Sequence, residues 1–187
     1  MPPGQVAAVV THLEMRRPPP RRPAPPAPGV ALARETPALG PFRDLFRRVG
    51  TPWLWSGALE RSDAEVAAWL GDPAVETWVP RRGGEALGLM QLDRREAGAC
   101  ELAYLGLVPE AVGTGLGRML MDRAVARAFA DGPVRLHVHT CTLDSPGALG
   151  FYVRSGFAPV RQEVEVRPDP RGRTLPPDAA PHLPPPT

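Results

Sequence analysis

The stretch PEAVGTGLGRML, residues 109–120, places three glycines at alternate positions directly before an amphipathic run. The residues before it, 102–108, predict a strand, and residues 117–130 predict a helix with one apolar and one charged face. Glycine has no Cβ, so backbone N–H groups can approach a ligand, and a helix N-terminus adds free donors and partial positive charge. The stretch therefore predicts a pyrophosphate site, with a tight turn that binds nothing as the alternative.

Two common phosphate-binding motifs do not fit this loop. The motif GxxxxGK[ST] requires a lysine, and the chain has none. The dinucleotide motif GxGxxG requires another spacing, because the glycines here follow Gly-x-Gly-x-Gly. The loop therefore has to be interpreted together with its neighbours along the chain.

Hydrophobic periodicity predicts alternating helices and strands in the rest of the chain. Strands are expected at residues 6–15, 75–80, 85–92, 99–108, 134–139 and 157–166, and helices at 41–49, 62–70 and 117–130, with a short helix from Ser145. Ser62 and Glu65 are spaced as a capping box. This order predicts an α/β fold with a mixed sheet and helices on both faces.

The 26 prolines divide the chain, because they concentrate between Pro18 and Pro41 and again after Val166. Such a composition is typical of linkers and tails. We therefore expect an N-terminal strand of the domain at 1–15, a proline- and arginine-rich linker at 16–41, a core at 42–166 and a proline-rich C-terminal tail at 167–187.

The charge balance argues against a nucleic-acid partner. The net charge is +2, yet residues 42–166 contain 14 arginines and 16 acidic residues, which gives −2. The N-terminus lacks a signal-peptide pattern, and no run of about 18 apolar residues could span a membrane. The two cysteines make no disulfide framework. We expect a soluble, cytoplasmic protein without nucleic-acid or membrane partners.

Two stretches resemble motifs of the GNAT N-acetyltransferase superfamily. VPEAVGTGLGRMLM, residues 108–121, is similar to its pattern [Q/R]-x-x-G-x-[G/A] after a strand, and ALGFYVRSGF, residues 148–157, resembles A-x-x-x-Y-x-x-x-G-F. The resemblance covers roughly residues 75–166 and implies a GNAT-like mixed, mostly antiparallel sheet with acetyl-CoA (coenzyme A) as cofactor. It implies cofactor contacts at Leu107, Val108, Gly113, Thr114, Gly115, Leu116, Gly117, Arg118 and Asp144.

Three departures from the family pattern change these expectations. Val112 replaces the usual Arg or Gln, so main-chain amides must bind the phosphates, and Asp144 stands where many members have Asn. Family members usually end in a β-hairpin, but here the chain turns to proline after Val166, so the seventh strand is expected to be missing. A partner chain could fill the gap, or it could stay open. Because exposed edges favour pairing, we expect a homodimer.

The family mechanism requires a base for the acceptor amine and an acid for the leaving thiolate. Tyr152 matches the family's acid by position, with a core tyrosine as the alternative. Glu101 lies in the strand where many GNAT enzymes place a glutamate base, with a solvated edge glutamate as the alternative. Glu14 is a lower-ranked candidate for the base and for the acceptor site.

The stretch HVHTC, residues 137–141, places His137, His139 and Cys141 on one strand face. Two histidines could ligate zinc with further ligands from elsewhere, and Cys141 could be a nucleophile beside histidine. In the resembling family this strand lies beside the cofactor and no metal is used. We therefore expect no metal, and either ordinary packing or a lining of the acceptor pocket.

The segment VGTPWLWSGALE, residues 49–60, corresponds to the part of GNAT enzymes that overhangs the acceptor site. Trp53 and Trp55 are two apart, so in an extended segment their rings point the same way. They could bind the acceptor, since tryptophan faces attract cations, or simply cover the core. A core charge of −2 favours a small amine with an aromatic or apolar body over a basic peptide.

These features predict an acetyl-CoA-dependent N-acetyltransferase that acts on a primary amine of a small molecule by direct attack in a ternary complex. A catalytically silent CoA-binding or regulatory module is one alternative, motivated by Val112 and the missing strand. Transfer of a longer acyl chain and N-acetylation of a protein are others.

Overall fold

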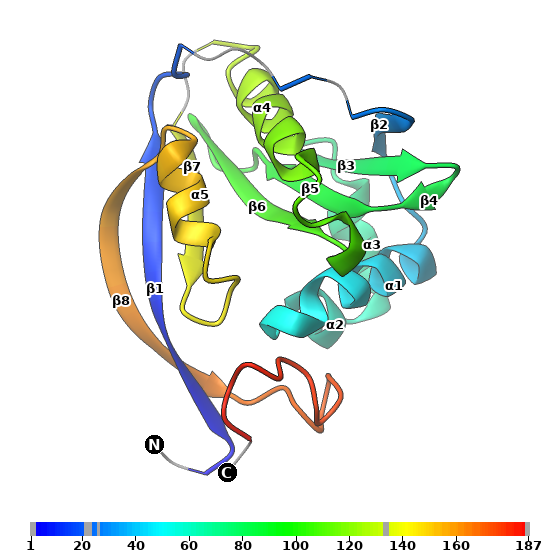
Figure 1. Ribbon diagram of the computed structural model, residues 1–187, viewed down its shortest axis with the longest axis vertical. Helices are drawn as coiled ribbons and strands as arrows, with labels where there is room; N and C mark the ends of the chain where they lie inside the picture. Colours follow the sequence, from blue (N-terminus) through cyan, green and yellow to red (C-terminus); the bar gives the residue numbers. More distant parts are fainter. Residues whose placement is uncertain (1–2, 21–23, 26, 133–134, 186–187) are drawn as a thin grey trace.

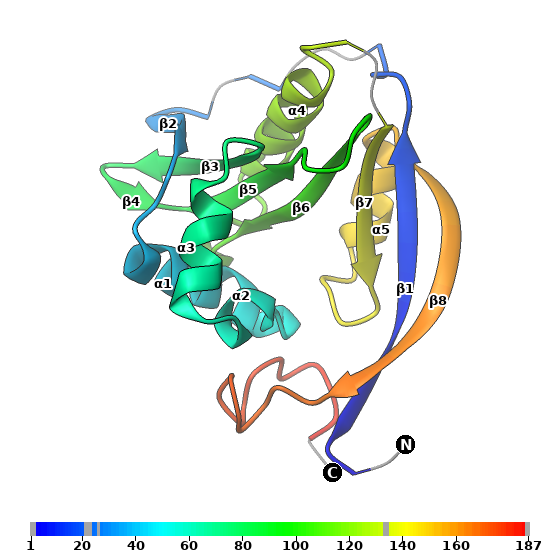
Figure 2. The same ribbon diagram turned by 180° about the vertical axis from the view of Figure 1, so that it is seen from behind.

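The strands form one eight-stranded sheet in the order β2-β3-β5-β6-β7-β1-β8, with the short β4 paired to β3. The computed structural model describes residues 3–20, 24–25, 27–132 and 135–185. Neighbouring strands are antiparallel except β6 and β7, which are parallel. Helices cover both faces, with α4 and α5 on one and α1, α2 and α3 on the other (Figures 1 and 2). The predicted mixed, mostly antiparallel sheet is confirmed.

The elements follow the predicted order closely. They are β1 (Gln5–Met15), β2 (Val30–Glu35), α1 (Leu39–Gly50), α2 (Gly57–Glu60), α3 (Asp63–Gly71), β3 (Val75–Arg82), β4 (Glu85–Ala86), β5 (Gly88–Asp93), β6 (Ala99–Leu107), α4 (Leu116–Ala128), β7 (Arg135–Cys141), α5 (Ala148–Arg154) and β8 (Ala158–Pro168). The expected strand start at residue 134 lies outside the described residues. Among the described helices, none has the length and apolar character needed to cross a bilayer.

Local sequence patterns explain why the helices form where they do. The apolar residues of α1 at helical spacing, Phe42, Leu45, Phe46 and Val49, are buried. At α3 the predicted capping box is present, because the Ser62 hydroxyl accepts from the Glu65 amide while the Glu65 carboxylate accepts from the Ser62 amide. The apolar face of α1 therefore packs against the core, and the cap fixes where α3 begins.

The N-terminal strand β1 has an interior place in the sheet. It lies between β7 and β8 and pairs antiparallel with both. In the described part of the chain after Pro168 no further strand follows β8, so the final hairpin is truncated as expected. The position beside β8 is taken by β1 of the same chain, which closes the gap from which we expected a partner. The homodimer stays a prediction and loses that support.

The proline-rich segment at 16–41 is not a linker throughout. Residues Val30–Glu35 form β2, which pairs with β3 along its whole length at one edge of the sheet. Its Val30 and Leu32 pack against the core on alternate positions. The neighbouring prolines suggested a linker and so hid this strand in the sequence. Its stability also depends on β3, a partner distant in sequence, which local patterns do not reveal.

β6 and β7 pair over only three residues each, Ala99–Glu101 with Arg135–His137. Beyond these pairs, in the described residues, the edge of β6 from residue 102 to residue 107 has no strand beside it on the β7 side. Main-chain N–H and C=O groups on such an edge need other partners. The separation of the two strands therefore positions a site in the middle of the sheet.

Candidate active site

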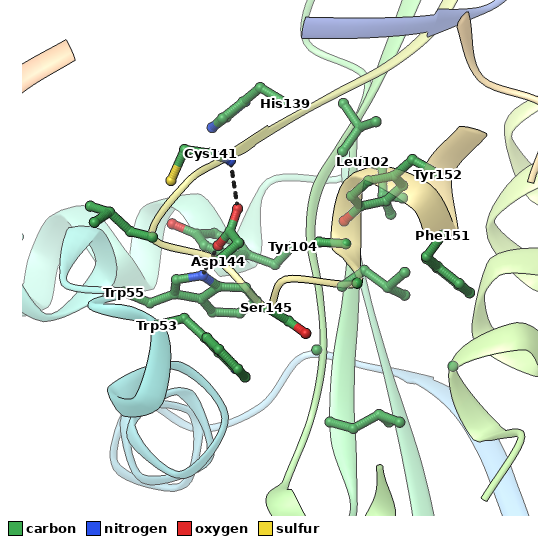
Figure 3. Close-up of a pocket in the computed structure, with 18 of the residues that line it drawn as sticks. Trp53, Trp55, Leu102, Tyr104, His139, Cys141, Asp144, Ser145, Phe151 and Tyr152 are labelled. Atoms are coloured by element: carbon green, nitrogen blue, oxygen red, sulfur yellow. Dashed lines mark hydrogen bonds between the residues drawn. The ribbon is translucent and has the colours of Figure 1, made fainter. Parts of the chain in front are cut away.

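A single cavity of about 660 Å³ occupies the opening between β6 and β7. At one end it is lined by the glycine loop and the start of α4, and along its length by β6 residues 102–107. At the other end its walls come from the α1–α2 connection, β1, β7 and β8. Figure 3 shows the side chains that converge there. We call the two ends the loop end and the tryptophan end.

The loop end has glycines in a backbone conformation that other residues rarely adopt. Gly113 and Gly115 have φ of 80° and 83°, and no atom lies within 4 Å of a Cβ built on either. Both line the cavity, so the space that a side chain would fill belongs to the site. The sequence therefore needs glycine here both for the turn and for access to the backbone.

The amides of this loop are available to a ligand. In the part of the chain that the structure describes, the N–H groups of residues 113–117 donate no hydrogen bond, while those of Arg118 and Met119 already bond to the carbonyl of Gly115. Helix α4 starts at Leu116, so the positive end of its dipole faces the same space. Val112 lines the cavity with 64% of its surface exposed and offers no polar group.

The predicted cofactor residues divide into two groups. Those that line the cavity are Leu107, Gly113, Gly115, Gly117, Arg118 and Asp144. Val108 and Leu116 are instead buried in the core, and the Thr114 hydroxyl donates to the carbonyl of Ala111 at 2.7 Å. The main chain of Val108 is bonded as well, because its N–H donates to the Leu87 carbonyl and its own carbonyl accepts from the Ala111 amide. The amides of Thr114 and Leu116 are free to meet a ligand.

Asp144 connects the two walls of the tryptophan end. Its Oδ1 accepts from Nε1 of Trp55 at 3.0 Å, and its Oδ2 accepts from the Thr140 hydroxyl and the Cys141 amide at 2.7 and 2.9 Å (Figure 3). The carboxylate therefore fixes the Trp55 indole against the loop that follows β7. Its contact with a cofactor stays a prediction.

Trp53 and Trp55 both line the cavity, and Trp55 also covers the core. The ring of Trp55 packs against Tyr104 and Phe46, with centroids 5.3 and 5.8 Å away. Gly106 makes room for it, because a Cβ there would lie 2.9 Å from Cη2 of the indole. Trp55 therefore both covers the core and lines the cavity, and its contact with an acceptor stays a prediction.

Tyr152 lies on α5, is 8% exposed, and turns its hydroxyl toward the cavity (Figure 3). Phe151 and Phe157 hold its ring in edge-on contacts at 5.8 and 5.9 Å. Burial raises the pKa of the phenol well above its ordinary value, and the charge of Asp144 adds to the shift. The hydroxyl is therefore protonated at neutral pH.

Glu101 does not line the cavity but contacts a residue that does. Its Oε1 lies 3.5 Å from Nδ1 of His139, which lines the tryptophan end. This contact raises the pKa of His139 and lowers the pKa of Glu101. The strand pattern predicted only packing or a lining of the acceptor pocket for His139, on the same face as His137 and Cys141.

Two further cavity residues, Glu165 and Arg167, were not foreseen at all. They lie on β8, and Arg167 donates to the Ser56 hydroxyl and to the carbonyl of Leu54 at 3.2 and 3.0 Å. Their position depends on the pairing of β8 with β1, which the sequence order did not indicate. The sheet topology therefore adds charged groups to the tryptophan end.

The other candidates lie outside the cavity or lack the expected chemistry. Glu14 bonds to Arg135 and Arg16 at 3.0 and 2.9 Å and is absent from the cavity wall. Cys141 lines the cavity as a free thiol, and burial, with the charge of Asp144, raises its pKa. A protonated thiol is a poor nucleophile. Among the described residues no group of three or more His, Cys, Asp or Glu side chains could hold a metal.

Two curated relatives, both named mycothiol acetyltransferase, are similar to parts of the chain. The protein from Jonesia denitrificans is 39% identical over 64 residues, which cover 34% of this chain and 20% of that protein. The protein from Beutenbergia cavernae is 36% identical over 111 residues, which cover 56% of this chain and 36% of that protein. The chain thus matches only about a fifth and a third of these relatives' lengths.

Solved structures and a family model agree on the fold. The PaiA N-acetyltransferase from Thermoplasma acidophilum, solved in complex with coenzyme A, superimposes with a TM-score of 0.52 at 15% identity, covering 74% of this chain and 99% of that one. The model of the acetyltransferase (GNAT) family matches residues 42–157. With the glycine loop at the start of α4 and the strand opening beside it, these findings show that the chain belongs to the GNAT family of acetyltransferases.

Proposed function

We propose that the chain transfers an acetyl group from acetyl-CoA to a primary amine of a small molecule, by direct attack in a ternary complex. The observation that carries this proposal is the continuity of the cavity. One space joins the free amides at the loop end to the aromatic and titratable side chains at the tryptophan end. Donor and acceptor can therefore meet within it, without a covalent enzyme intermediate.

The loop end fits the pyrophosphate of acetyl-CoA. Five free amides, from residue 113 to residue 117, and the α4 dipole supply donors and positive potential. The unpaired edge of β6 offers main-chain groups to the amide-containing arm of the cofactor. When bound, acetyl-CoA supplies the acetyl group and a thiolate leaving group.

In this proposal His139 takes the proton of the acceptor amine and Glu101 supports it. His139 faces the cavity, and the Glu101 carboxylate behind it holds the ring and stabilises its protonated form. The raised pKa makes His139 a stronger base than an ordinary histidine, which favours general base catalysis. Glu101, our expected base, then acts through His139.

In this proposal Tyr152 protonates the leaving sulfur. Its raised pKa keeps a proton on the hydroxyl at neutral pH, and this proton can pass to the leaving sulfur. The transfer then balances: the ammonium first gives one proton to His139, which passes it to water, and the neutral amine forms the C–N bond. As the C–S bond breaks, the second amine proton goes to His139, and Tyr152 recovers from water the proton that it gave to the sulfur. A silent binding module would have no need for these two groups beside one cavity.

The tryptophan end favours a small acceptor with an apolar body and a cationic amine. Trp53 and Trp55 supply faces, and Glu165 adds a carboxylate to the wall. The name of the two curated relatives refers to a small molecule, which supports the same acceptor class. N-acetylation of a protein is the competing function for the same cavity.

The test is native mass spectrometry of the purified chain with acetyl-CoA, followed by thiol release with a panel of small amines and lysine-rich peptides. We expect binding of one acetyl-CoA per chain and acceptor-dependent thiol release with small amines. Binding without release from any acceptor would support the silent module instead. Peptides as the best acceptors would overturn the small-molecule assignment.

A further inference from the structure

The C-terminal segment, residues 169–185, is folded onto the domain instead of forming the solvated tail that its prolines suggested. Leu175, Ala179 and Ala180 are buried, and Ala180 has no exposed surface. The Asp169–Arg171 ion pair is 2.7 Å long, and its side chains are only 5% and 6% exposed. Arg171 also donates to the carbonyl of Pro184 at 2.7 Å, which joins the two ends of the segment.

The segment packs against the back of the tryptophan end. Its buried apolar residues form one cluster with Leu54, Leu143, Val6 and Ala8. The ring of His182 lies against Trp53, with centroids 5.4 Å apart. Figures 1 and 2 show the segment, in orange and red, beneath α2 and the loop that follows β7.

Four residues beside the segment line the cavity, whereas the segment's own described residues do not. Trp53, Leu54, Leu143 and Ala8 all line the cavity. Among the described residues 169–185, none does. Any effect of the segment on a ligand must therefore pass through the wall that it supports.

This wall needs outside support because its backbone is strained. Leu54 has a φ of 55°, in the left-handed region that non-glycine residues rarely adopt, and it is completely buried. Arg167, on β8 just before the segment, donates to its carbonyl at 3.0 Å. The buried apolar residues of the segment share one cluster with the Leu54 side chain. Such a conformation persists only where the surroundings over-determine it.

We propose that residues 169–185 form a positioning element that fixes the acceptor wall at Trp53–Ser56 and thereby sets the size and affinity of the acceptor. Leu175 belongs to the buried cluster that contains Leu54, and the ring of His182 lies beside Trp53. This inference rests on the proposed function for its kinetic consequence, but the support of the wall can be measured without any activity.

The experiment compares the full chain with a variant ending at Pro168, with Leu175→Ala and with His182→Ala. Asp178→Ala is the matched control, because Asp178 lies in the same segment, is exposed and contacts neither Leu54 nor Trp53. Leu175→Ala keeps the segment's backbone, so it serves if the shortened chain does not fold. Hydrogen exchange of the amides at 51–57 is measured first, and then acceptor KM, kcat and the acetyl-CoA Kd.

We expect faster exchange at 51–57 in the shortened chain and in Leu175→Ala, a smaller change in His182→Ala, and none in Asp178→Ala. Acceptor KM should rise about tenfold, with the acetyl-CoA Kd unchanged within about twofold, since only one wall of the cavity loosens. Bulkier amines should gain relative to small ones.

Unchanged exchange at 51–57 in folded variants would overturn the inference, and so would a parallel rise of the acceptor KM and the cofactor Kd. If the full chain releases no thiol with any amine while the exchange result holds, the proposed function fails and the positioning role stands.

Discussion

The two ends of the cavity are built in different ways. The loop end comes from one continuous stretch, β6 through the first turn of α4, and presents mainly backbone. The tryptophan end is assembled from β1, the α1–α2 connection, β7, β8 and, behind them, the C-terminal segment. It presents side chains that depend on each other, such as Trp55 on Asp144. The loop end is therefore encoded by a local stretch of sequence, whereas the tryptophan end forms only when the strands of the sheet have paired.

The largest effect should follow from closing the loop end. In Gly115→Val the new side chain occupies the space in front of the free amides. Loss of two hydrogen bonds to a charged group, at about 1.5 kcal/mol each, corresponds to roughly 100-fold weaker acetyl-CoA binding. Calorimetry measures this Kd.

The control for backbone strain is Gly98→Val. Gly98 has a φ of 73° and also has no atom within 4 Å of an added Cβ, but it lies in the turn before β6, away from the cavity. Both variants should lose similar stability, because both force valine into a left-handed conformation. Equal acetyl-CoA affinity in the two variants would contradict a backbone site for the cofactor.

The same contrast explains what the sequence could and could not predict. The glycine loop and the capping box of α3 follow from local spacing, and both lie where the spacing indicated. Tyr152 was singled out by the family resemblance, and it lines the cavity. The places of β1 and β2 do not, because strand pairing joins residues far apart in the chain. The cavity residues on β8 depend on its pairing with β1, and the contact between His139 and Glu101 depends on the pairing of β7 with β6, so neither was predicted.

Tyr152→Phe tests the junction between the two ends. It removes the proton donor and keeps the ring that Phe151 and Phe157 hold. We expect kcat to fall about 100-fold, the lower range for loss of a general acid, while the acetyl-CoA Kd changes by less than about twofold. Steady-state kinetics beside calorimetry separates the two. A kcat close to that of the unchanged chain would leave Tyr152 as a core residue only.

Glu101→Gln tests whether the tryptophan end carries the base. Glu101 raises the pKa of His139, so its loss should lower that pKa. His139 accepts a proton only when neutral, and activity therefore grows as pH rises through its pKa. The acidic limb of kcat should shift to lower pH, with a loss of up to about tenfold on the plateau because the weaker base is less effective.

The reference for this pH profile is His139→Gln, which should abolish the limb. The groups that face His139 from the neighbouring elements are Glu101, His12, Asp144 and Glu165, and the last two also raise its pKa. Some upward shift should therefore survive in Glu101→Gln. An acidic limb that is identical in all three proteins would assign the titration to the acceptor amine.

Asp144→Asn should produce a smaller effect, confined to the tryptophan end. The substitution replaces one carboxylate oxygen by an NH2 group, which donates, so either the Nε1–H of Trp55 or the N–H of Cys141 loses its acceptor. We expect acceptor KM to rise about fivefold, equivalent to one hydrogen bond of about 1 kcal/mol. A change in acetyl-CoA Kd of the same size would instead make Asp144 a cofactor residue.

The smallest effect is expected at Val112, where the family usually has Arg or Gln. The valine side chain is 64% exposed, lines the loop end and carries no polar atom, so it contributes no hydrogen bond to a phosphate. Val112→Ala should change the acetyl-CoA Kd by less than about twofold, as for most exposed substitutions.

Val112→Arg should have the opposite effect and strengthen acetyl-CoA binding. A guanidinium beside the free amides adds a charge-assisted contact at a solvent-exposed site, where such a contact contributes up to about 1 kcal/mol, or a few-fold tighter binding. This gain should weaken at high salt, because exposed charges are screened, whereas the affinity due to the backbone amides should persist. A large loss of binding in Val112→Ala would mean that the loop end depends on its side chains, and the contrast with the tryptophan end would fail.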